Sequence, residues 1–446
     1  MEIKQFNDHN LAHYSYAIIS NGEMALIDPA RNPQPYYDYA NAHNSKITTI
    51  IETHPHADFV SSHLEIHNTK GATIYVSKLL GAEYPHQTFD DGDSIVLGKI
   101  NLKAINTPGH SPDSISIVAI NEDGKYEAVF TGDTLFIGDC GRPDLRETAG
   151  TITANRIDLA KQMYHSLRSK LMLLPEETLV YPAHGAGSLC GKGLSSKNTS
   201  TIGAEKISNW SLQEMSEADF VTELLANQAY IPKYFTYNVE LNKKGATPFE
   251  AGVAAVPKQN SPIEFLNPNI IIIDTRPQDQ FKKSHLKGAI NLMNDTKFES
   301  WLGSIVNPYE KFYLIAENEM IINELIQRIA KIGYENQIEL GFTLNTGDAK
   351  SSFFDSKLLN NIEEAYTIVD IRSNSEVNST PIFDNALNIP LNELRERTNE
   401  IPTHKPILVH CAGGYRSAAG SSIIKANIAG TSEVFDLSED VKKIKK

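Results

Sequence analysis

Cysteine is scarce in this sequence, with Cys140, Cys190 and Cys411 the only three in 446 residues. Three thiols cannot form a disulfide framework for so long a chain, so we expect a reducing, cytoplasmic setting. Long hydrophobic runs are absent as well, since no stretch approaches the roughly 18 apolar residues that a membrane-spanning helix needs. The net charge of −14 leaves no excess of positive charge. We therefore expect neither a nucleic acid nor an anionic membrane as a partner.

The length of 446 residues predicts about three domains, because one hydrophobic core rarely serves so long a chain. The first part is rich in strand signals: "HYSYAIIS" and "EMALID" flank Asn21-Gly22, a strong hairpin signal. "KITTIIET" predicts a buried strand that leads to His54. "FVSSHLEIHNTKG" has helical spacing and stops at Gly71.

Beyond a polar stretch near residues 242–261 the chain alternates predicted strands and helices, and the alternation repeats. Asp274-Thr-Arg is matched by Asp370-Ile-Arg 96 residues later, and "KGAINL" is matched by "DNALNI". This internal repeat predicts two small α/β domains with mostly parallel sheets. The predicted domains are residues 1–240, 262–350 and 355–446.

Histidine and aspartate gather at four predicted strand ends of the first domain. Loops that follow separate strands can bring such side chains together at one edge of a sheet sandwich. A lone histidine is more often a surface or core residue, but several segments of this kind in one domain indicate a metal site. The segments are "THPHAD" with His54, His56 and Asp58, "TPGH" with His110, "TGD" with Asp133 and "PAHG" with His184.

This pattern resembles the metallo-β-lactamase superfamily across roughly residues 1–235, which implies an αββα sandwich with the metal at one edge. The family motif is T-H-x-H-x-D-H, and its Asp-His pair serves a second metal in the dinuclear hydrolases. Here Phe59 replaces the second histidine of that pair, and a phenyl ring has no lone pair to donate. A second site would keep Asp58, His184 and a bridging Asp133 but lose one nitrogen ligand. We therefore predict a mononuclear site.

The segment "GDTLFIGDCGRPDL" at residues 132–145 resembles the persulfide dioxygenase branch, which has a "CGR-D" segment just after its metal aspartate. In that branch one Fe(II) is bound by the first motif histidine, the "PGH" histidine and the "GD" aspartate. The resemblance implies one Fe(II) per chain, bound by His54, His110 and Asp133. Two histidines and one carboxylate leave open positions for substrate and O2.

On this interpretation His56, Asp58 and His184 orient the ligands or bound water, or else make only structural hydrogen bonds. Phe59 departs from this branch too, where histidine is usual. The loop after His184 is also longer than usual in the branch, and it carries Cys190.

Cys190 lies among small residues in "GAGSLCGKG", where Lys192 could favour a thiolate. It is either a sulfur relay or substrate gate near the iron, or a buried inert cysteine. Cys140 is assigned to packing. Arg142 either binds an anionic thiol carrier or pairs with Asp139 or Asp144, and the pairing is slightly favoured.

Cys411 follows the predicted buried strand "PILVH" and begins the loop "CAGGYRS", which leads into a helical segment. Backbone N–H groups and the positive end of that helix would favour a thiolate. Gly413 and Gly414 let the backbone curl around the sulfur. With Tyr415 they are the predicted substrate contacts, and Arg416 can hold an anionic sulfur group. The alternative is a buried cysteine beside a chance arginine.

C-x-x-G-Y-R-S resembles the active loop of the rhodanese sulfurtransferases, and residues 355–446 resemble one rhodanese domain. The resemblance implies that Cys411 carries a persulfide and passes on its outer sulfur. The first repeat copy has no such loop: aligning "KFYLIAENEM" with "KPILVHCAGG" puts Glu317 at the cysteine position. A carboxylate cannot carry sulfane sulfur, so we predict that residues 262–350 form a rhodanese-like domain without catalytic activity.

Together these resemblances imply an α/β multidomain chain that fuses a persulfide dioxygenase to a sulfurtransferase. A low-molecular-weight thiol persulfide would be oxidised by O2 to sulfite and thiol, and sulfur transfer from Cys411 to sulfite would give thiosulfate. This would detoxify sulfide in the cytoplasm, and we expect a homo-oligomer. One alternative is a zinc-dependent hydroxyacylglutathione-type thioester hydrolase fused to a sulfurtransferase. Another is a non-catalytic sulfur-responsive interaction protein.

Overall fold

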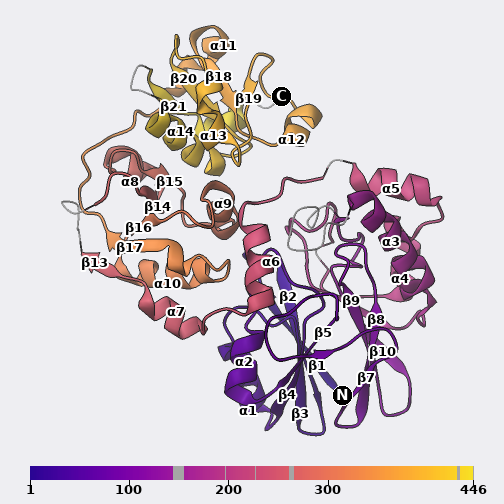
Figure 1. Cartoon of the computed structure of the whole chain (residues 1–446). Coiled ribbons are helices and arrows are strands. Elements are labelled where there is room, and N and C mark those ends of the chain that lie inside the picture. The colour runs from indigo at the N-terminus through magenta and orange to yellow at the C-terminus, as the bar shows by residue number, and fades with distance from the viewer. Residues whose placement is uncertain (144–154, 196, 227, 261–265, 429–431, 445–446) are drawn as a thin grey trace. The chain divides into compact units, whose positions relative to one another are not determined.

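The computed structural model describes residues 1–143, 155–195, 197–226, 228–260, 266–428 and 432–444 (Figure 1). The chain divides into two compact units. The first comprises Met1–Ala251 with Ala330–Gly333, and the second comprises Gly252–Ile329 with Tyr334–Lys446. The predicted boundaries at residues 240, 262, 350 and 355 remain predictions.

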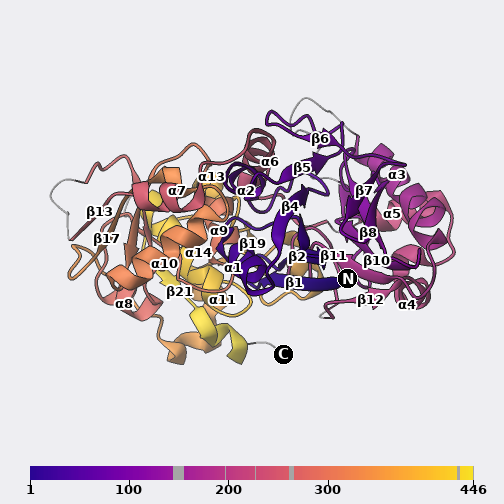
Figure 2. The ribbon, with the colours of Figure 1, turned by 90° about the horizontal axis from the view of Figure 1, so that it is seen from below.

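The first unit is built on two six-stranded sheets that lie face to face. Figures 1 and 2 show helices on the outer face of each sheet, α1 and α2 on one side and α3, α4 and α5 on the other. The predicted αββα sandwich is therefore confirmed. The first sheet has the order β1 (Glu2–Asp8), β2 (His13–Ser20), β3 (Glu23–Ile27), β4 (Lys46–Ile51), β5 (Thr73–Val76) and β6 (Gln87–Thr88). The second has the order β12 (Ser200–Thr201), β11 (Leu179–Pro182), β10 (Tyr126–Gly132), β9 (Ile115–Ile120), β8 (Ile100–Asn106) and β7 (Ser94–Leu97).

The helices of this unit cover the two sheets, except for those at its C-terminal end, which lead toward the second unit in the sequence. Asn155 caps α3 by accepting from the Ile157 N–H, which satisfies one of the unpaired donors at the helix start. α2 ends where Gly71 adopts a φ of 71°, as its sequence predicted. The helices are α1 (Gln34–Ala42), α2 (His63–Lys70), α3 (Arg156–Ser169), α4 (Ile202–Ser208), α5 (Glu217–Leu225), α6 (Tyr234–Lys244) and α7 (Phe249–Ala255), the last of which spans the division between the units.

The hairpin of β2 and β3 forms at Asn21-Gly22, where both residues have positive φ, 51° and 80°. Successive side chains of β3 point to opposite faces of the sheet, and apolar residues are buried on both faces. Ile27 packs between the two sheets, whereas Leu26 packs beneath α1 and α2.

The second unit contains two sheets in which every strand pair is parallel. This confirms the predicted α/β repeat. The first sheet has the order β13 (Lys258–Asn260), β17 (Ile338–Thr343), β16 (Phe312–Ala316), β14 (Ile271–Asp274) and β15 (Ile290–Asn291), with helices α8 (Gln278–Lys283), α9 (Phe298–Ile305) and α10 (Glu319–Ala330). The second has the order β19 (Leu387–Asn388), β18 (Thr367–Asp370), β20 (Ile407–His410) and β21 (Val434–Asp436), with helices α11 (Ile362–Ala365), α12 (Asn374–Ser379), α13 (Leu394–Arg397) and α14 (Tyr415–Asn427).

The two copies share buried polar contacts that the sequence repeat pointed to. In the first, Arg276 Nη2 donates to Asp274 Oδ2 over 2.6 Å, and Asn291 Nδ2 donates to the Asp274 and Arg276 carbonyls. In the second, the Asp370–Arg372 pair has the same 2.6 Å contact, and Asn388 bonds the two equivalent carbonyls. The chain after β14 in the first copy and after β18 in the second is thus held by the same contacts.

The copies differ at the loop that leads from the third strand into its helix. Cys411 to Gly414 separate β20 from α14, whereas only Glu317 and Asn318 separate β16 from α10. The first copy therefore lacks the loop as well as the cysteine. Across the described helices of the whole chain, none combines the length and the apolar character that crossing a membrane would require.

Candidate metal centre and sulfur-transfer loop

The three predicted metal ligands, and His184 as one of the residues predicted to orient ligands or bound water, follow the carboxyl ends of strands from both sheets. His54 follows β4, His110 follows β8, Asp133 follows β10 and His184 follows β11. All four side chains are buried. The sandwich therefore brings together residues that are up to 130 positions apart in the sequence.

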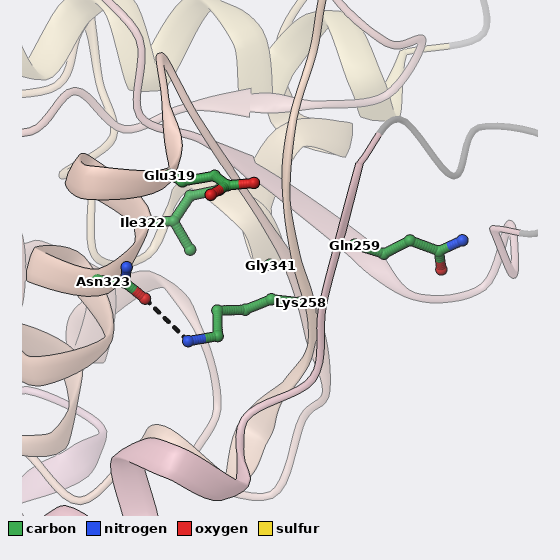
Figure 3. A pocket seen from close by; sticks show the side chains of 6 residues that line it. All are labelled: Lys258, Gln259, Glu319, Ile322, Asn323 and Gly341. Atoms are coloured by element: carbon green, nitrogen blue, oxygen red, sulfur yellow. Dashed lines mark hydrogen bonds between the residues drawn. The ribbon is translucent and has the colours of Figure 1, made fainter.

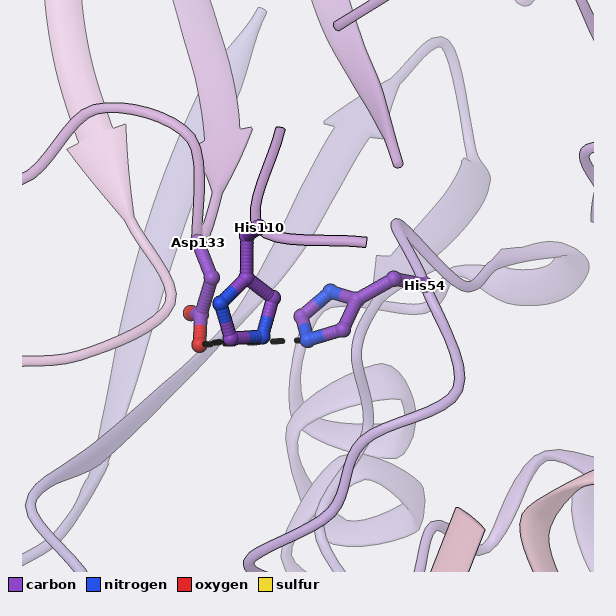
Figure 4. A group of neighbouring side chains, drawn as sticks. All are labelled: His54, His110 and Asp133. Atoms are coloured by element: carbon purple, nitrogen blue, oxygen red, sulfur yellow. Dashed lines mark ion pairs between the residues drawn. The ribbon is translucent and has the colours of Figure 1, made fainter. Parts of the chain in front are cut away.

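His54, His110 and Asp133 form one compact group. Nε2 of His54 lies 3.8 Å from Asp133 Oδ2, and Nε2 of His110 lies 3.5 Å from the same oxygen. Figure 4 shows both imidazoles directed at that carboxylate oxygen. The predicted residues are thus within the spacing at which three side chains can share one ion.

Hydrogen bonds on the opposite ring nitrogens orient these histidines. The Thr53 hydroxyl donates to Asp28 Oδ2 over 2.8 Å, so at 3.0 Å it accepts from Nδ1 of His54. Nδ1 of His110 donates to the Arg142 carbonyl over 2.8 Å. Both tautomers therefore leave the lone pair on Nε2, the nitrogen that faces Asp133.

The donor set fits a metal ion. Both carboxylate oxygens of Asp133 are buried and accept no hydrogen bond among the described residues, an arrangement that is costly for an anion without a cation. Burial raises the pKa of Asp133 to about 6, although the charge of His184 opposes the rise. Two imidazole nitrogens and one carboxylate suit a first-row transition ion such as Fe(II).

A second group lies beside the first. Nε2 of His184 lies 3.4 Å from Asp58 Oδ2 and 3.5 Å from Asp133 Oδ1, and His56 completes this group. The second metal site of the family motif would keep Asp58, His184 and the bridging Asp133, and all three lie together here. Phe59 takes the place of its remaining histidine, so one nitrogen donor is missing.

Phe59 packs against a histidine that the sequence did not single out. Its ring centroid lies 3.8 Å from that of His13 and 4.4 Å from that of His56. His13 is on β2, where its backbone bridges to His184. Burial lowers the pKa of His13 well below its usual value, so the ring is neutral. His13 was missed because it stands alone in a strand pattern, and only the pairing of β2 with the end of β11 brings it to the site.

The Nε2 atom of His56 lies next to two carboxylates that are not part of the His54–His110–Asp133 group. That nitrogen lies 3.1 Å from Asp28 Oδ1 and 3.8 Å from Glu52 Oε2. Burial lowers the pKa of His56, but the charges of Asp28 and Glu52 outweigh it and raise the value to about 9. The loop that carries His56 is held by Asn242 of α6, whose Nδ2 donates over 2.8 Å to the carbonyls of both His56 and Phe59.

Cys190 is buried and lies beside the candidate metal ligand Asp133 and beside His184. Its sulfur is within 4.8 Å of ligand atoms of Asp133 and His184. Burial raises the pKa of its thiol well above the usual value, and the charge of Asp133 adds to the rise. Lys192 does not offset this, because its Nζ donates to the Glu223 carbonyl. Cys140 is buried in the apolar cluster between the second sheet and its helices, in agreement with a packing role.

Arg142 is buried and bonds backbone groups. Its Nη1 donates to the Ala229 carbonyl over 2.6 Å and its Nη2 to the Tyr230 carbonyl over 3.3 Å. Asp139, one of its predicted partners, accepts from other groups, including the Cys140 N–H. The other predicted partner, Asp144, lies outside the described residues. Contact between Arg142 and an anionic thiol carrier remains a prediction.

Cys411 directly follows β20 and is the first residue of the loop that leads to the helix α14. Its side chain is buried, and its sulfur accepts from the Gly414 N–H over 3.1 Å. Gly414 has a φ of 106°, a conformation that glycine adopts without strain. Gly413 is exposed and leaves open space next to the loop. The backbone therefore turns around the sulfur as predicted, with the positive end of α14 behind it.

The two residues after the loop are fixed by neighbours. Arg416 donates from both Nη atoms to the Glu376 carboxylate, each over 2.7 Å. Tyr415 donates from its hydroxyl to the Met293 carbonyl over 3.1 Å. The predicted contacts of Arg416 and Tyr415 with substrate thus remain predictions, whereas their positioning contacts are evident.

The first copy offers no equivalent sulfur site. Glu317, at the cysteine position, is exposed and accepts from Gln280. A pocket of about 200 Å³ lies beside β13 and α10 (Figure 3). Lys258 donates to Asn323 across it over 2.9 Å, and no cysteine or histidine lines it.

Comparison with known proteins finds two families in this chain. The Metallo-beta-lactamase superfamily matches residues 10–184, and the Rhodanese-like domain matches residues 263–340 and 355–446. A crystal structure described as Metallo-beta-lactamase from Staphylococcus aureus subsp. aureus COL is similar to 76% of this chain over 99% of its own length, with 32% sequence identity and a TM-score of 0.70.

Two kinds of curated enzyme are similar to part of this chain. Hydroxyacylglutathione hydrolase cytoplasmic of Arabidopsis thaliana is 35% identical over 176 residues, which cover 39% of this chain and 63% of that protein. Persulfide dioxygenase ETHE1, mitochondrial, of Homo sapiens is 33% identical over 164 residues, which cover 36% of this chain and 59% of that protein. The chain thus spans about three fifths of the length of each relative.

Proposed function

Because this chain belongs to the metallo-beta-lactamase superfamily and ends in rhodanese-like domains, we propose that it is a persulfide dioxygenase fused to a sulfurtransferase. Its first activity consumes a low-molecular-weight thiol persulfide, RSSH, with one O2 and one water. It forms the thiol RSH and sulfurous acid, which ionises to sulfite. The outer sulfur is oxidised and O2 is reduced.

The observation that carries this proposal is the His54–His110–Asp133 group beside Phe59. The group supplies two nitrogen donors and one carboxylate whose buried oxygens accept no hydrogen bond from any described residue. Phe59 withholds the nitrogen that would complete a second metal site. Dioxygenation requires one metal ion with open coordination positions for persulfide and O2. The dinuclear hydrolases of the family use two metal ions instead.

The residues of the site have separable tasks. Fe(II), when bound, supplies open coordination positions for persulfide and O2 and the redox chemistry that oxidises sulfur. Thr53 and the Arg142 carbonyl hold the imidazoles of His54 and His110 with Nε2 toward the ion. The charge of Asp133 balances the ion in a buried setting. Phe59 and His13 pack against each other and exclude water from one side.

Cys411 performs the second activity: its thiolate attacks the outer sulfur of another persulfide RSSH, the S–S bond of that persulfide breaks, and the thiol RSH leaves while Cys411 keeps the sulfane sulfur as a persulfide. In the transfer step the S–S bond of the Cys411 persulfide breaks, sulfite attacks the outer sulfur, and thiosulfate leaves with the thiolate of Cys411 regenerated. The Gly414 N–H and the α14 N-terminus favour negative charge on the sulfur throughout. Cys190, next to Asp133 and His184, is the candidate sulfur relay or substrate gate near the iron, and a buried inert cysteine is the alternative. The cytoplasmic setting and the homo-oligomer remain predictions.

A zinc-dependent thioester hydrolase is the second candidate. It is favoured by the 35% identity to the hydroxyacylglutathione hydrolase and by the closeness of His56, Asp58 and His184. Such an enzyme would activate water on zinc.

One experiment separates the two. The full chain is purified anaerobically, its metals are quantified, and it is supplied with either a glutathione persulfide or a hydroxyacyl thioester. Iron with persulfide-dependent O2 uptake supports the proposal. Zinc with thioester cleavage and no O2 uptake would replace the proposal with the hydrolase.

A further inference from the structure

A second polar cluster is buried behind the first metal group. Asp28 follows β3 and Glu52 follows β4. His56 lies on the loop between β4 and α2, and His63 is the first residue of α2. Their exposed fractions are 2%, 2%, 0% and 1%. None of the four belongs to the His54–His110–Asp133 group.

Asp28, Glu52 and His56 offer ligand atoms that all lie within 4.8 Å of one another, and His63 adjoins this group through Glu52. Nε2 of His56 is 3.1 Å from Asp28 Oδ1 and 3.8 Å from Glu52 Oε2, and Nδ1 of His63 is 3.5 Å from Glu52 Oε1. Donors on a tetrahedral ion at about 2.0–2.1 Å are separated by about 3.3 Å. The first metal group has comparable separations of 3.5 and 3.8 Å.

Several polar atoms of the cluster have no hydrogen-bond partner among the described residues. They are Oε2 of Glu52, Nδ1 of His56 and both ring nitrogens of His63. Buried polar atoms are rarely left in this state, because each costs free energy unless it is paired. The other atoms of the two carboxylates are already used: Asp28 accepts from Thr53, and Oε1 of Glu52 accepts from Ser61 over 2.6 Å.

The charge of the cluster also calls for a cation. Asp28 and Glu52 are two buried carboxylates, and within the described chain their ion-pair partners are His56 and His63 alone. One divalent ion would cancel both negative charges at a single point and engage the unpaired atoms together.

We propose that Asp28, Glu52, His56 and His63 bind a second, structural divalent transition-metal ion, distinct from the ion at His54, His110 and Asp133. Two imidazoles and two carboxylates select a first-row ion such as Zn²⁺ over Mg²⁺ or Ca²⁺, which prefer oxygen ligands alone. The ion ties the ends of β3 and β4 to the start of α2. It thereby fixes the loop on which His54 is carried, and it takes no part in the chemistry.

The test counts ions in the full chain. The His110→Ala/Asp133→Ala double variant removes the first site, and Zn²⁺ uptake is measured by equilibrium dialysis and elemental analysis. We expect the unmodified chain to take up two ions and the double variant to keep one. Adding Glu52→Gln or, separately, His63→Gln to the double variant should remove it, with folding checked by circular dichroism. His67→Gln, on the same helix but outside the cluster, is the matched control and should keep the ion.

The melting temperature gives an independent readout. Zn²⁺ should raise it in the double variant and in the His67→Gln control, but not after Glu52→Gln or His63→Gln. A double variant that binds no Zn²⁺, or an unmodified chain that saturates at one ion, would overturn the proposal. So would an ion that survives both Glu52→Gln and His63→Gln, because it would then lie at His56, Asp58 and His184. Each outcome is independent of whether the first site oxidises persulfides.

Discussion

The hydroxyl of Thr53 donates to Asp28 Oδ2 over 2.8 Å and thereby presents its lone pairs to Nδ1 of His54, 3.0 Å away. The Thr53 N–H also donates to Asp28, over 2.7 Å. Asp28 therefore sets the tautomer of His54 through one intervening side chain. A residue with no direct contact to the ion fixes which nitrogen faces it.

Thr53→Val should weaken iron binding about 10–100-fold, the usual loss when a hydrogen bond that orients a ligand is removed. The substitution keeps the branched shape of the side chain, so the packing of the strand end is preserved. Iron affinity is measured by competition with a chelator. Thr49→Val, at a buried threonine on β4 whose hydroxyl pairs with that of Thr48, should leave the affinity unchanged. Equal affinities for Thr53→Val and the unmodified chain would show that Thr53 does not orient His54.

Cys411→Ser should end sulfur transfer to sulfite and leave persulfide-dependent O2 uptake largely intact. A serine hydroxyl fits the loop but cannot carry sulfane sulfur, and the iron ligands lie in the other unit. Thiosulfate and O2 are measured in the same reaction. Thiosulfate formation at the normal rate would mean that Cys411 is not the carrier.

Cys190→Ser should change the ratio of sulfite to thiosulfate if the thiol relays sulfur or gates substrate. Its sulfur is within 4.8 Å of ligand atoms of Asp133 and His184, so it can meet a persulfide at the ion. Cys140→Ser, at the packing cysteine, is the control and should leave the ratio unchanged if the variant folds. An unchanged product ratio and unchanged kinetics in Cys190→Ser would discard the relay.

The Glu376–Arg416 pair should make the stability of the chain depend on pH in the acid range. Burial raises the pKa of Glu376, but the hydrogen bonds and charge of Arg416 outweigh it and lower the value from 4.5 to about 2. The unfolded chain therefore takes up this proton first. The contribution is fully present above about pH 4.5 and is lost as the pH falls toward 2.

Denaturant unfolding at pH 6, 4 and 3 measures this effect. The difference in unfolding free energy between the unmodified chain and Glu376→Gln should shrink as the pH falls, because glutamine has no proton to gain. A difference that stays constant over this range would show that the pair is not formed in solution.

The sequence predicted the elements that have strong local signals. The Asn21-Gly22 hairpin and the end of α2 at Gly71 follow from residues close together in the chain, and the α/β repeat follows from short segments that recur; all three are confirmed. Contacts between residues far apart in the chain were harder to predict from the sequence. His13 carries no local signal and reaches the site through a strand pairing, and Lys192 was predicted to favour a thiolate although its ammonium bonds elsewhere.

Glu376 illustrates the same limit from the side of the sulfur-transfer loop. It lies on α12, 40 residues before Arg416, and it also closes the capping box with Ser373. Nothing in the loop sequence indicates that the arginine would be bound by a carboxylate from that helix. Motifs predict which residues are chemically able to act, but the fold determines which of them are already committed to a partner.

The central claim is tested most directly by O2 consumption and sulfite formation in the iron-loaded chain with glutathione persulfide, measured in the Cys411→Ser background to prevent conversion of sulfite to thiosulfate. The account predicts one sulfite for each O2 consumed, and no O2 uptake or iron binding once Asp133→Ala is added. O2 consumption without formation of sulfite would contradict the account. So would an Asp133→Ala variant that keeps its iron and its O2 uptake.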